Sequence, residues 1–364
     1  MISMDKASIE LVILLCGFLL GIIFGFACQR SRFCFLGIIS DVYIYRNLNR
    51  LSLYLFTLIT AVLGVQFLSG PGLISPADST YMNISDKTIS SVFGGLLFGI
   101  GMTFCSGCTT STLIKLGEGN IKSLIILTLS GITAISTMRG SLSNIRLYLF
   151  EDNFLAIKIN NFFEKKDLFG TDMGWLWLIL LLNSLALLLF KQPKNIEIRK
   201  NVIWGLVIGV CIVGAWFISG SIGFLAEHPD TLESKYLLTN SGKPESFSFI
   251  GPLAYSLEFF LYQSDSSKFI SFGIIVLFGL LVGSYLSACL HNRFRIEFFT
   301  TKNDFIYCVL GSFLMGFGGV AASGCTLGHG LSGLSIGSFD SIIVAGSIIL
   351  GTVLGMRHIE NKVA

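Results

Sequence analysis

The sequence predicts an all-α, polytopic membrane protein, and three observations support this fold class. Hydrophobic residues make up 52% of the 364 residues and charged residues only 13%, with a mean hydropathy of +0.75. A soluble domain carries roughly a quarter charged residues. Apolar stretches of spanning length recur along the chain, and one glycine-rich segment occurs twice. We therefore expect residues 1–364 to form a single membrane domain in the lipid bilayer.

Nine apolar segments are predicted to cross the bilayer as helices. They lie at 9–28, 52–70, 89–108, 122–138, 175–190, 202–220, 270–290, 304–320 and 339–356. An odd number of spans puts the termini on opposite sides of the membrane. One set of alternate loops holds more Lys and Arg, which predicts an outer N-terminus and an inner C-terminus. The loops 139–174 and 221–269 are expected to be polar insertions on the outer side.

The tetrapeptide Ser-Gly-Cys-Thr occurs at 106–109 and again at 323–326, in similar glycine-rich surroundings. The first span also resembles the sixth, and an offset of an odd number of spans inverts the second copy across the membrane. The approximate halves 9–190 and 202–356 are thus predicted to form an inverted internal repeat. In transporter folds of this kind the binding site lies where the repeats meet.

Each tetrapeptide leads into a segment that is too polar and glycine-rich to be an ordinary lipid-facing helix. Irregular backbone persists at membrane depth only where protein buries it or where it lines a wet cavity. We therefore expect two re-entrant segments that meet near the midplane, where half-helix N-termini favour an anion. The candidate contacts are thiols, hydroxyls and glycines that allow close approach: Cys108, Cys325, Thr109, Thr326, Ser323, Gly107 and Gly324.

Four further residues extend this candidate pathway. Cys34 follows Arg32 at the inner end of the first span, and a chain that folds back there would bring this thiol to the centre. Arg32 is interpreted either as a positive-inside anchor or as part of the pathway. His329 is expected to line the pore rather than to bind a metal, and Glu118 to cap or gate the first re-entrant segment.

Other functional classes have weaker support in the sequence. A net charge of +3 does not suggest a nucleic-acid partner, and no phosphate-binding loop is recognisable, so we expect no cofactor and no ATP coupling. Cys105 and Cys108 have the C-x-x-C spacing of redox and zinc motifs, but Ala322 replaces the first cysteine in the second copy. A membrane thiol-disulfide or sulphur-transfer enzyme therefore remains an alternative, as does a channel-like scaffold without a specific substrate.

Three segments together resemble the YeeE/YedE family, also called the sulphur transport family. They are QRSRFC at 29–34, FGIGMTFCSGCTTSTLIKLGEGNIKSL at 98–124 and GFGGVAASGCTLGHGLSGLSIGSFDS at 316–341. The resemblance implies a non-enzymatic transporter in the bacterial inner membrane. Its substrate would be a small sulphur-containing anion, with thiosulfate favoured and selenium compounds as the alternative. By the same resemblance, Cys34, Cys108 and Cys325 would pass the anion along without a lasting covalent bond.

Cys105 departs from the family pattern and leaves the exact substrate open. The three pathway thiols are expected to stay neutral, because a thiolate would repel the anion and apolar surroundings disfavour charge. The spans hold few acidic residues that could carry protons. We therefore expect entry down a gradient that cytoplasmic metabolism, or a small cytoplasmic sulphur-carrier protein, maintains.

Overall fold

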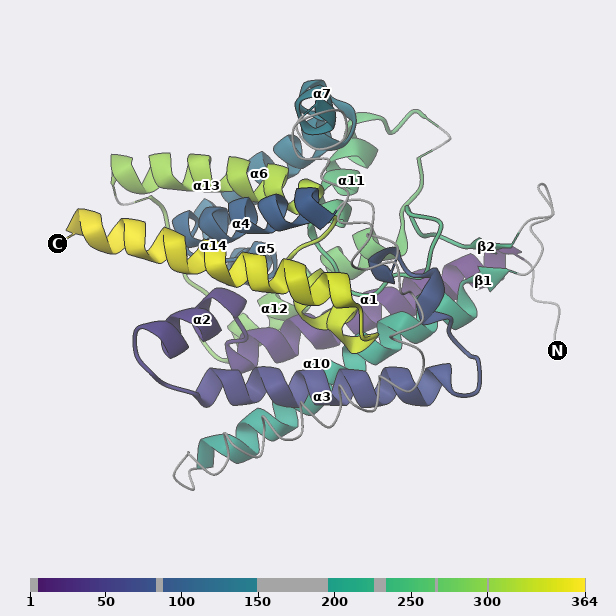
Figure 1. Cartoon of the computed structure of the whole chain (residues 1–364). Coiled ribbons are helices and arrows are strands. Elements are labelled where there is room, and N and C mark those ends of the chain that lie inside the picture. Colours follow the sequence, from purple (N-terminus) through teal and green to yellow (C-terminus); the bar gives the residue numbers. More distant parts are fainter. Residues whose placement is uncertain are drawn as a thin grey trace.

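The structure is a computed structural model that describes residues 6–82, 88–148, 196–225, 234–265, 268–299 and 301–363. Within these ranges the chain is almost entirely helical (Figure 1). The one sheet among them is a two-residue antiparallel pair, β1 (Phe224–Leu225) with β2 (Lys235–Tyr236). The prediction of an all-α polytopic membrane protein is thus confirmed.

Eight helices in the described residues are long and apolar enough to cross a membrane. They are α1 (Lys6–Ser31), α3 (Asn49–Ser69), α4 (Thr88–Phe104), α6 (Ile121–Arg139), α10 (Ile196–Phe217), α12 (Phe272–Leu290), α13 (Lys302–Ala321) and α14 (Phe339–Val363). Each overlaps one of the predicted spans, so eight of those nine segments are confirmed as helices. The remaining prediction, 175–190, falls outside the described residues.

The long helices form two groups of four. In one group α1 packs along α12, α3 packs along α10, and α1 contacts α10; in the other α4 packs along α13 and α14, and α13 packs along α6. Figure 1 shows the second group above the first, with the C-terminus at the end of α14. Small residues permit these close approaches. A Cβ added at Gly283 in α12 would lie 2.0 Å from the carbonyl oxygen of Ile22 in α1.

Four short helical segments lie between the two groups and connect them. They are α2 (Phe35–Tyr43), α5 (Thr109–Gly117), α11 (Ile250–Leu261) and the π-helical turn η7 (Gly328–Gly333). Helix α5 contacts α12 and α6, and η7 contacts α3 and α14; α2 contacts α3 and α14, and α11 contacts α12 and α6. The polar segments after the two tetrapeptides therefore sit at the centre of the molecule.

The remaining described elements lie at the ends of the long helices. They are the 3₁₀ turns η1 (Pro76–Asp78) and η2 (Thr80–Met82), the short helix α7 (Ser141–Leu147) and the π-helical turn η6 (Ile218–Ile222). The predicted insertion 221–269 contains more than polar loop. Its second half contains α11, an apolar helix with Leu253 and Ala254 among its buried residues. Most of the predicted insertion 139–174 falls outside the described residues.

Candidate functional site

Three helices end in the same backbone turn, and a cysteine follows two residues after each turn. The turn residues Arg32, Ser106 and Ser323 have φ of 55°, 54° and 58°. At each end the next residue donates its N–H to the carbonyl five positions back, as in Phe33 to Cys28 at 3.0 Å. This is the Schellman motif that terminates α-helices, here with residues other than glycine in the left-handed position.

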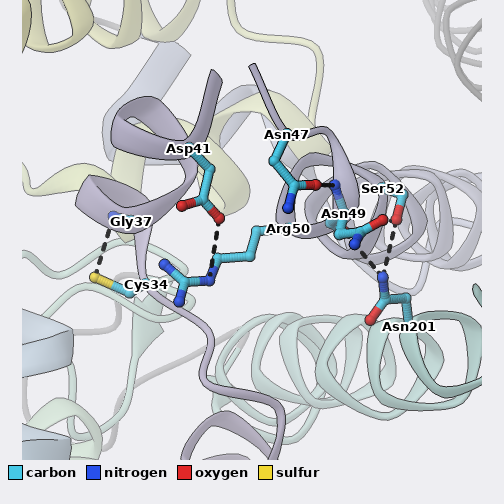
Figure 2. Close-up of polar contacts among 8 residues, drawn as sticks. All are labelled: Cys34, Gly37, Asp41, Asn47, Asn49, Arg50, Ser52 and Asn201. Atoms are coloured by element: carbon cyan, nitrogen blue, oxygen red, sulfur yellow. Dashed lines mark hydrogen bonds and ion pairs between the residues drawn. The ribbon is translucent and has the colours of Figure 1, made fainter. Parts of the chain in front are cut away.

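The cysteine after each turn stands at the N-cap of the next helical segment. Cys34 caps α2, and its sulfur accepts a hydrogen bond from the backbone N–H of Gly37 at 3.4 Å (Figure 2). Cys108 caps α5, and Cys325 precedes the helical turn that begins at Thr326. Each thiol therefore lies beside free backbone N–H groups at a helix start, where the local field favours negative charge.

Helix α2 is held in place by a polar network at its far end. Figure 2 shows the Asp41 carboxylate of α2 facing the Arg50 guanidinium of α3, with the nitrogen and oxygen 3.3 Å apart. Asn201 of α10 donates to the carbonyl of Asn49 at 2.8 Å and to the hydroxyl of Ser52 at 3.0 Å. These contacts link α2, α3 and α10, and so fix the position of the Cys34 cap.

A small cavity lies where the helix caps at Cys34 and Cys108 meet the segment that follows Cys325. Its lining residues are Phe33, Cys34, Phe35, Cys108, Thr110, Thr326, Leu327 and Leu331. The cavity volume of about 10 Å³ is near the minimum for one water molecule. The structure thus brings together three of the predicted residues, Cys34, Cys108 and Thr326, in a closed conformation.

Two hydroxyl groups at the start of α5 lack partners. The side chains of Thr109 and Thr110 are 0% and 3% exposed, and neither Oγ1 has a hydrogen-bond partner among the described residues. Most buried hydroxyls are paired, because an unpaired one costs free energy. The next two residues follow that rule: Ser111 and Thr112 both donate to the carbonyl of Cys108, at 3.0 and 2.9 Å. Thr110 also lines the cavity, so the side chain with this unpaired hydroxyl forms part of its wall.

Cys325 is fully buried and lies beside a second set of hydroxyls. Its sulfur is 3.8 Å from the Oγ of Ser248, which directly precedes the N-cap of α11. A Cβ added at Gly328 would lie 2.8 Å from the Tyr81 hydroxyl and 3.1 Å from the Ser248 hydroxyl. Burial raises the pKa of Tyr81 above its ordinary value, and a hydrogen bond with Ser248 opposes this rise.

The other predicted residues occupy supporting positions. His329 is fully buried; its Nε2 lies 2.8 Å from the carbonyl oxygen of Ala322 and its Nδ1 lies 3.2 Å from the Ser341 hydroxyl. It thus ties η7 to the end of α13 and to α14, and it is not among the cavity-lining residues. Gly324 makes room for this ring, since an added Cβ would lie 2.7 Å from Nε2. At Gly107 the nearest atom to an added Cβ is the Ser111 hydroxyl oxygen, 2.5 Å away, which rotation about one side-chain bond can move.

Glu118, Arg32 and Ser323 also lie away from the cavity lining. Glu118 accepts a hydrogen bond from the buried amide of Gln29 at 3.0 Å, and Gln29 accepts one from Ser287 at 2.6 Å. This chain joins α5, α1 and α12 at their ends. Arg32 and Ser323 are exposed and supply the left-handed turn before their cysteines.

Cys105 faces away from the three caps. Its sulfur lies 3.5 Å from the carbonyl oxygen of Cys308 and 3.7 Å from the hydroxyl of Ser312, both in α13. All nine cysteines are free thiols. The C-x-x-C spacing thus spans the helix break, with Cys105 packed on α13 and Cys108 in the cavity wall.

Sequence reasoning missed several residues around the site. Nothing in the sequence sets Thr110 apart from the neighbouring hydroxyls, whereas in the structure its Oγ1 has no hydrogen-bond partner among the described residues. Lys115 in α5 donates to the carbonyl of Ser106 at 2.6 Å, which puts a cation beside the first cap. Ser248 lies in a predicted loop, but the similarity of residues 247–251 to 33–37 is a signal that could have identified it.

Comparisons with known proteins agree with the resemblance seen in the sequence. A family model described as sulphur transport matches residues 30–354. The thiosulfate transporter TsuA of Escherichia coli (strain K12) is 26% identical over 341 residues, which cover 87% of this chain and 86% of that protein. The thiosulfate transporter TsuA of Spirochaeta thermophila is 22% identical over 342 residues, covering 92% and 96% respectively.

Proposed function

The chain belongs to the sulphur transport family, and from this premise we propose that it takes up thiosulfate or a similar small sulphur oxyanion. Two relatives named as thiosulfate transporters match almost the whole chain, which supports this substrate. The observation that carries the proposal is the cavity between the helix caps, where two thiols adjoin a buried hydroxyl that has no partner among the described residues. The proposed location of the transporter is the bacterial inner membrane.

The lining of the cavity suits a soft dianion. Burying an unpaired double charge is prohibitive, so the site must offer several donors at once. Backbone N–H groups at the starts of α2 and α5, the Thr110 hydroxyl and neutral thiols supply them without a fixed cation in the wall. The polarizable sulfurs of Cys34 and Cys108 suit the terminal sulphur of thiosulfate. Weak donors also allow release, which a transport pathway requires.

The cavity has to widen for transport, because about one water molecule fills its volume. Phe33 and Phe35 close it on the side of α2, and Leu327 and Leu331 close it on the side of η7. We propose that these apolar groups separate Cys34 and Cys108 from Cys325 and move aside as the anion passes from one thiol to the next. No lasting bond to sulfur forms in this scheme.

The packing supports the inverted repeat as part of the proposal. In the repeat α1 corresponds to α10, α3 to α12, α4 to α13 and α6 to α14. Under this correspondence the packed pair α1 and α12 matches the packed pair α10 and α3, and the pair α4 and α14 matches the pair α13 and α6. The contact between α4 and α13 is consistent with the same correspondence. Gly94 packs against Gly318, and the glycines that correspond to them in the repeat, Gly311 and Gly101, also pack against each other. In this scheme the N-terminus lies outside and the C-terminus inside, and the sites of the two halves face opposite sides.

Net uptake in this scheme runs down a gradient that cytoplasmic consumption maintains. A small cytoplasmic sulphur-carrier protein is one candidate consumer. A selenium compound is the alternative substrate, since its softness would suit the same thiols. A thiol-disulfide enzyme is less well supported, because Cys105 packs on α13 and the cavity holds Cys108 without it.

Growth of a bacterium that lacks its own sulphate and thiosulfate importers tests the proposal, with thiosulfate as the sole sulphur source. We expect wild type to restore growth and the uptake of radiolabelled thiosulfate, and Cys108→Ala and Cys325→Ala to lose both. Cys289→Ala is the matched control, since this thiol is exposed on α12. Failure of well-expressed wild type to import thiosulfate would overturn the proposed substrate and bring selenium compounds forward.

A further inference from the structure

A second short repeat accompanies the two tetrapeptides. Residues 33–37 read Phe-Cys-Phe-Leu-Gly and residues 247–251 read Phe-Ser-Phe-Ile-Gly. The first stretch enters α2 and the second enters α11. In this alignment Ser248 stands where the first half has Cys34, so the two positions differ by a hydroxyl in place of a thiol.

The packing of the two short helices supports this alignment independently of the sequence. Helix α2 contacts α3 and α14, whereas α11 contacts α12 and α6. These are the neighbours that the correspondence of α3 with α12 and of α14 with α6 requires. Helix α11 is therefore the structural counterpart of α2, although it lies in the segment that the sequence suggested to be an outer loop.

The two positions also have similar surroundings. Cys34 is partly exposed and shares the cavity wall with the buried Cys108. Ser248 is partly exposed and its Oγ lies 3.8 Å from the sulfur of the buried Cys325. The Ser248 hydroxyl also faces Gly328, together with the hydroxyl of Tyr81. In each half, therefore, a buried cysteine at a helix N-cap has a partly exposed polar side chain beside it.

We infer that Ser248 contacts the transported anion, forming with Cys325 and Tyr81 a binding station in the second half that corresponds to Cys34 and Cys108 in the first. The inference rests on the proposed function for the identity of the anion. A serine hydroxyl is a stronger hydrogen-bond donor than a thiol, so this station suits the oxygen end of a sulphur oxyanion. The station with two thiols suits its sulphur end.

Transport by purified protein in liposomes tests the inference, with Ser248→Ala and Ser248→Cys compared with wild type. Losing a hydrogen bond to a charged group lowers binding by about tenfold or more, so we expect Ser248→Ala to raise KM for thiosulfate by that factor. Ser248→Cys keeps a donor and retains most uptake. The matched control is Ser256→Ala on the same helix, whose hydroxyl donates to the carbonyl of Leu253 at 2.8 Å and which is not among the residues that line the cavity of Cys34 and Cys108.

A labelling measurement separates a contact residue from a merely structural one. A membrane-impermeant methanethiosulfonate reagent is applied to Ser248→Cys, and the peptide that carries position 248 is followed by mass spectrometry. We expect modification that thiosulfate slows several-fold, which a structural role would not produce. Ser248→Ala with wild-type KM, or modification that thiosulfate does not slow in a protein that transports it, overturns the inference alone. Absence of thiosulfate uptake by wild type overturns the proposed function. Even in that case the labelling tests the inference separately: if the cysteine introduced at position 248 does not react with the reagent, the inference is overturned.

Discussion

The unpartnered hydroxyl of Thr110 allows a test in which stability and transport move in opposite directions. Thr110→Val removes the hydroxyl and keeps the branched shape of a side chain that is 3% exposed. In the protein without substrate, Oγ1 has no hydrogen-bond partner among the described residues. The substitution therefore takes away a buried polar group without breaking a bond within the protein.

The expected magnitudes follow from the cost of an unpaired hydroxyl and the value of a charged hydrogen bond. Leaving a buried hydroxyl unpaired costs about 1–3 kcal/mol, so Thr110→Val should raise the free energy of unfolding by up to that amount. A hydrogen bond to a charged acceptor contributes about 1.5–3 kcal/mol, so thiosulfate affinity should fall roughly 10- to 150-fold. A residue with only a structural role would not combine these two effects.

Thermal unfolding of the purified protein measures the first effect, and initial rates of thiosulfate uptake into liposomes measure the second. Thr112→Val is the matched control, because it lies two residues along α5, is 1% exposed and donates to the carbonyl of Cys108 at 2.9 Å. That variant loses an existing hydrogen bond, the one from the Thr112 hydroxyl, so its free energy of unfolding should fall by about 0.5–1.5 kcal/mol. Its uptake should stay close to that of wild type.

Two results would refute this reasoning. If Thr110→Val destabilises the protein as much as Thr112→Val does, the hydroxyl has a partner within the folded chain. If Thr110→Val transports thiosulfate as wild type does, the cavity is not where the anion binds.

Three further predictions test neighbouring parts of the site. Cys105→Ser should leave uptake within about twofold of wild type, whereas Cys108→Ser should lower it further because it removes a polarizable sulfur from the cavity wall; equal losses in transport would favour the thiol-disulfide alternative. Lys115→Gln should raise KM, and more so at low ionic strength, because the lost charge attracts the anion over distances that salt screens; a KM change independent of salt would argue against this. Gly324→Ala should lower the free energy of unfolding by about 1–3 kcal/mol, because the new Cβ would clash with the buried imidazole of His329. Gly107→Ala should cost less in the same unfolding measurement, because its Cβ meets the Ser111 hydroxyl, which a single bond rotation can move with the loss of one hydrogen bond; equal costs would contradict the packing argument.

Much of the fold was predictable because membrane spans depend on simple local properties. Length and apolarity located the long helices, with most boundaries within four residues of the predicted ones. The exceptions are the start of α10, which lies six residues before its predicted position, and the end of α14, which lies seven residues beyond it. The breaks at the two tetrapeptides were predictable too, since polar, glycine-rich sequence cannot continue a lipid-facing helix. Helix α11 was not recognised as a membrane-embedded element, because it has only 12 residues and follows a polar stretch.

The site was predictable as a set of residues but not as a geometry. The repeat identified Cys108 and Cys325, and the structure puts Cys34 and Thr326 beside the first of these thiols. The role of His329 could not be read from its position in a polar segment. Whether a buried imidazole lines a pore or ties two helices together depends on the partners that tertiary packing brings, here Ala322 and Ser341.

In the proposed inverted repeat the two halves have corresponding helices but different polar side chains, and this difference bears on the direction of transport. Counting from each tetrapeptide, the position of Lys115 in the first half is taken by Ser332 in the second, whose hydroxyl donates to the carbonyl of Phe247 at 2.9 Å. A cation beside one station strengthens anion binding there, on the inner side in the proposed orientation.

A fixed charge of this kind cannot drive net uptake by itself, because it changes the binding free energy equally for entry and for return. In the absence of coupling, direction comes from the concentration difference across the membrane. If Lys115 only strengthens the inner station, Lys115→Gln should slow uptake and efflux from preloaded liposomes by the same factor. Unequal changes in the two directions, measured at thiosulfate concentrations well below KM with equal and opposite gradients and no other gradient, would reveal a second coupled solute and refute simple downhill entry.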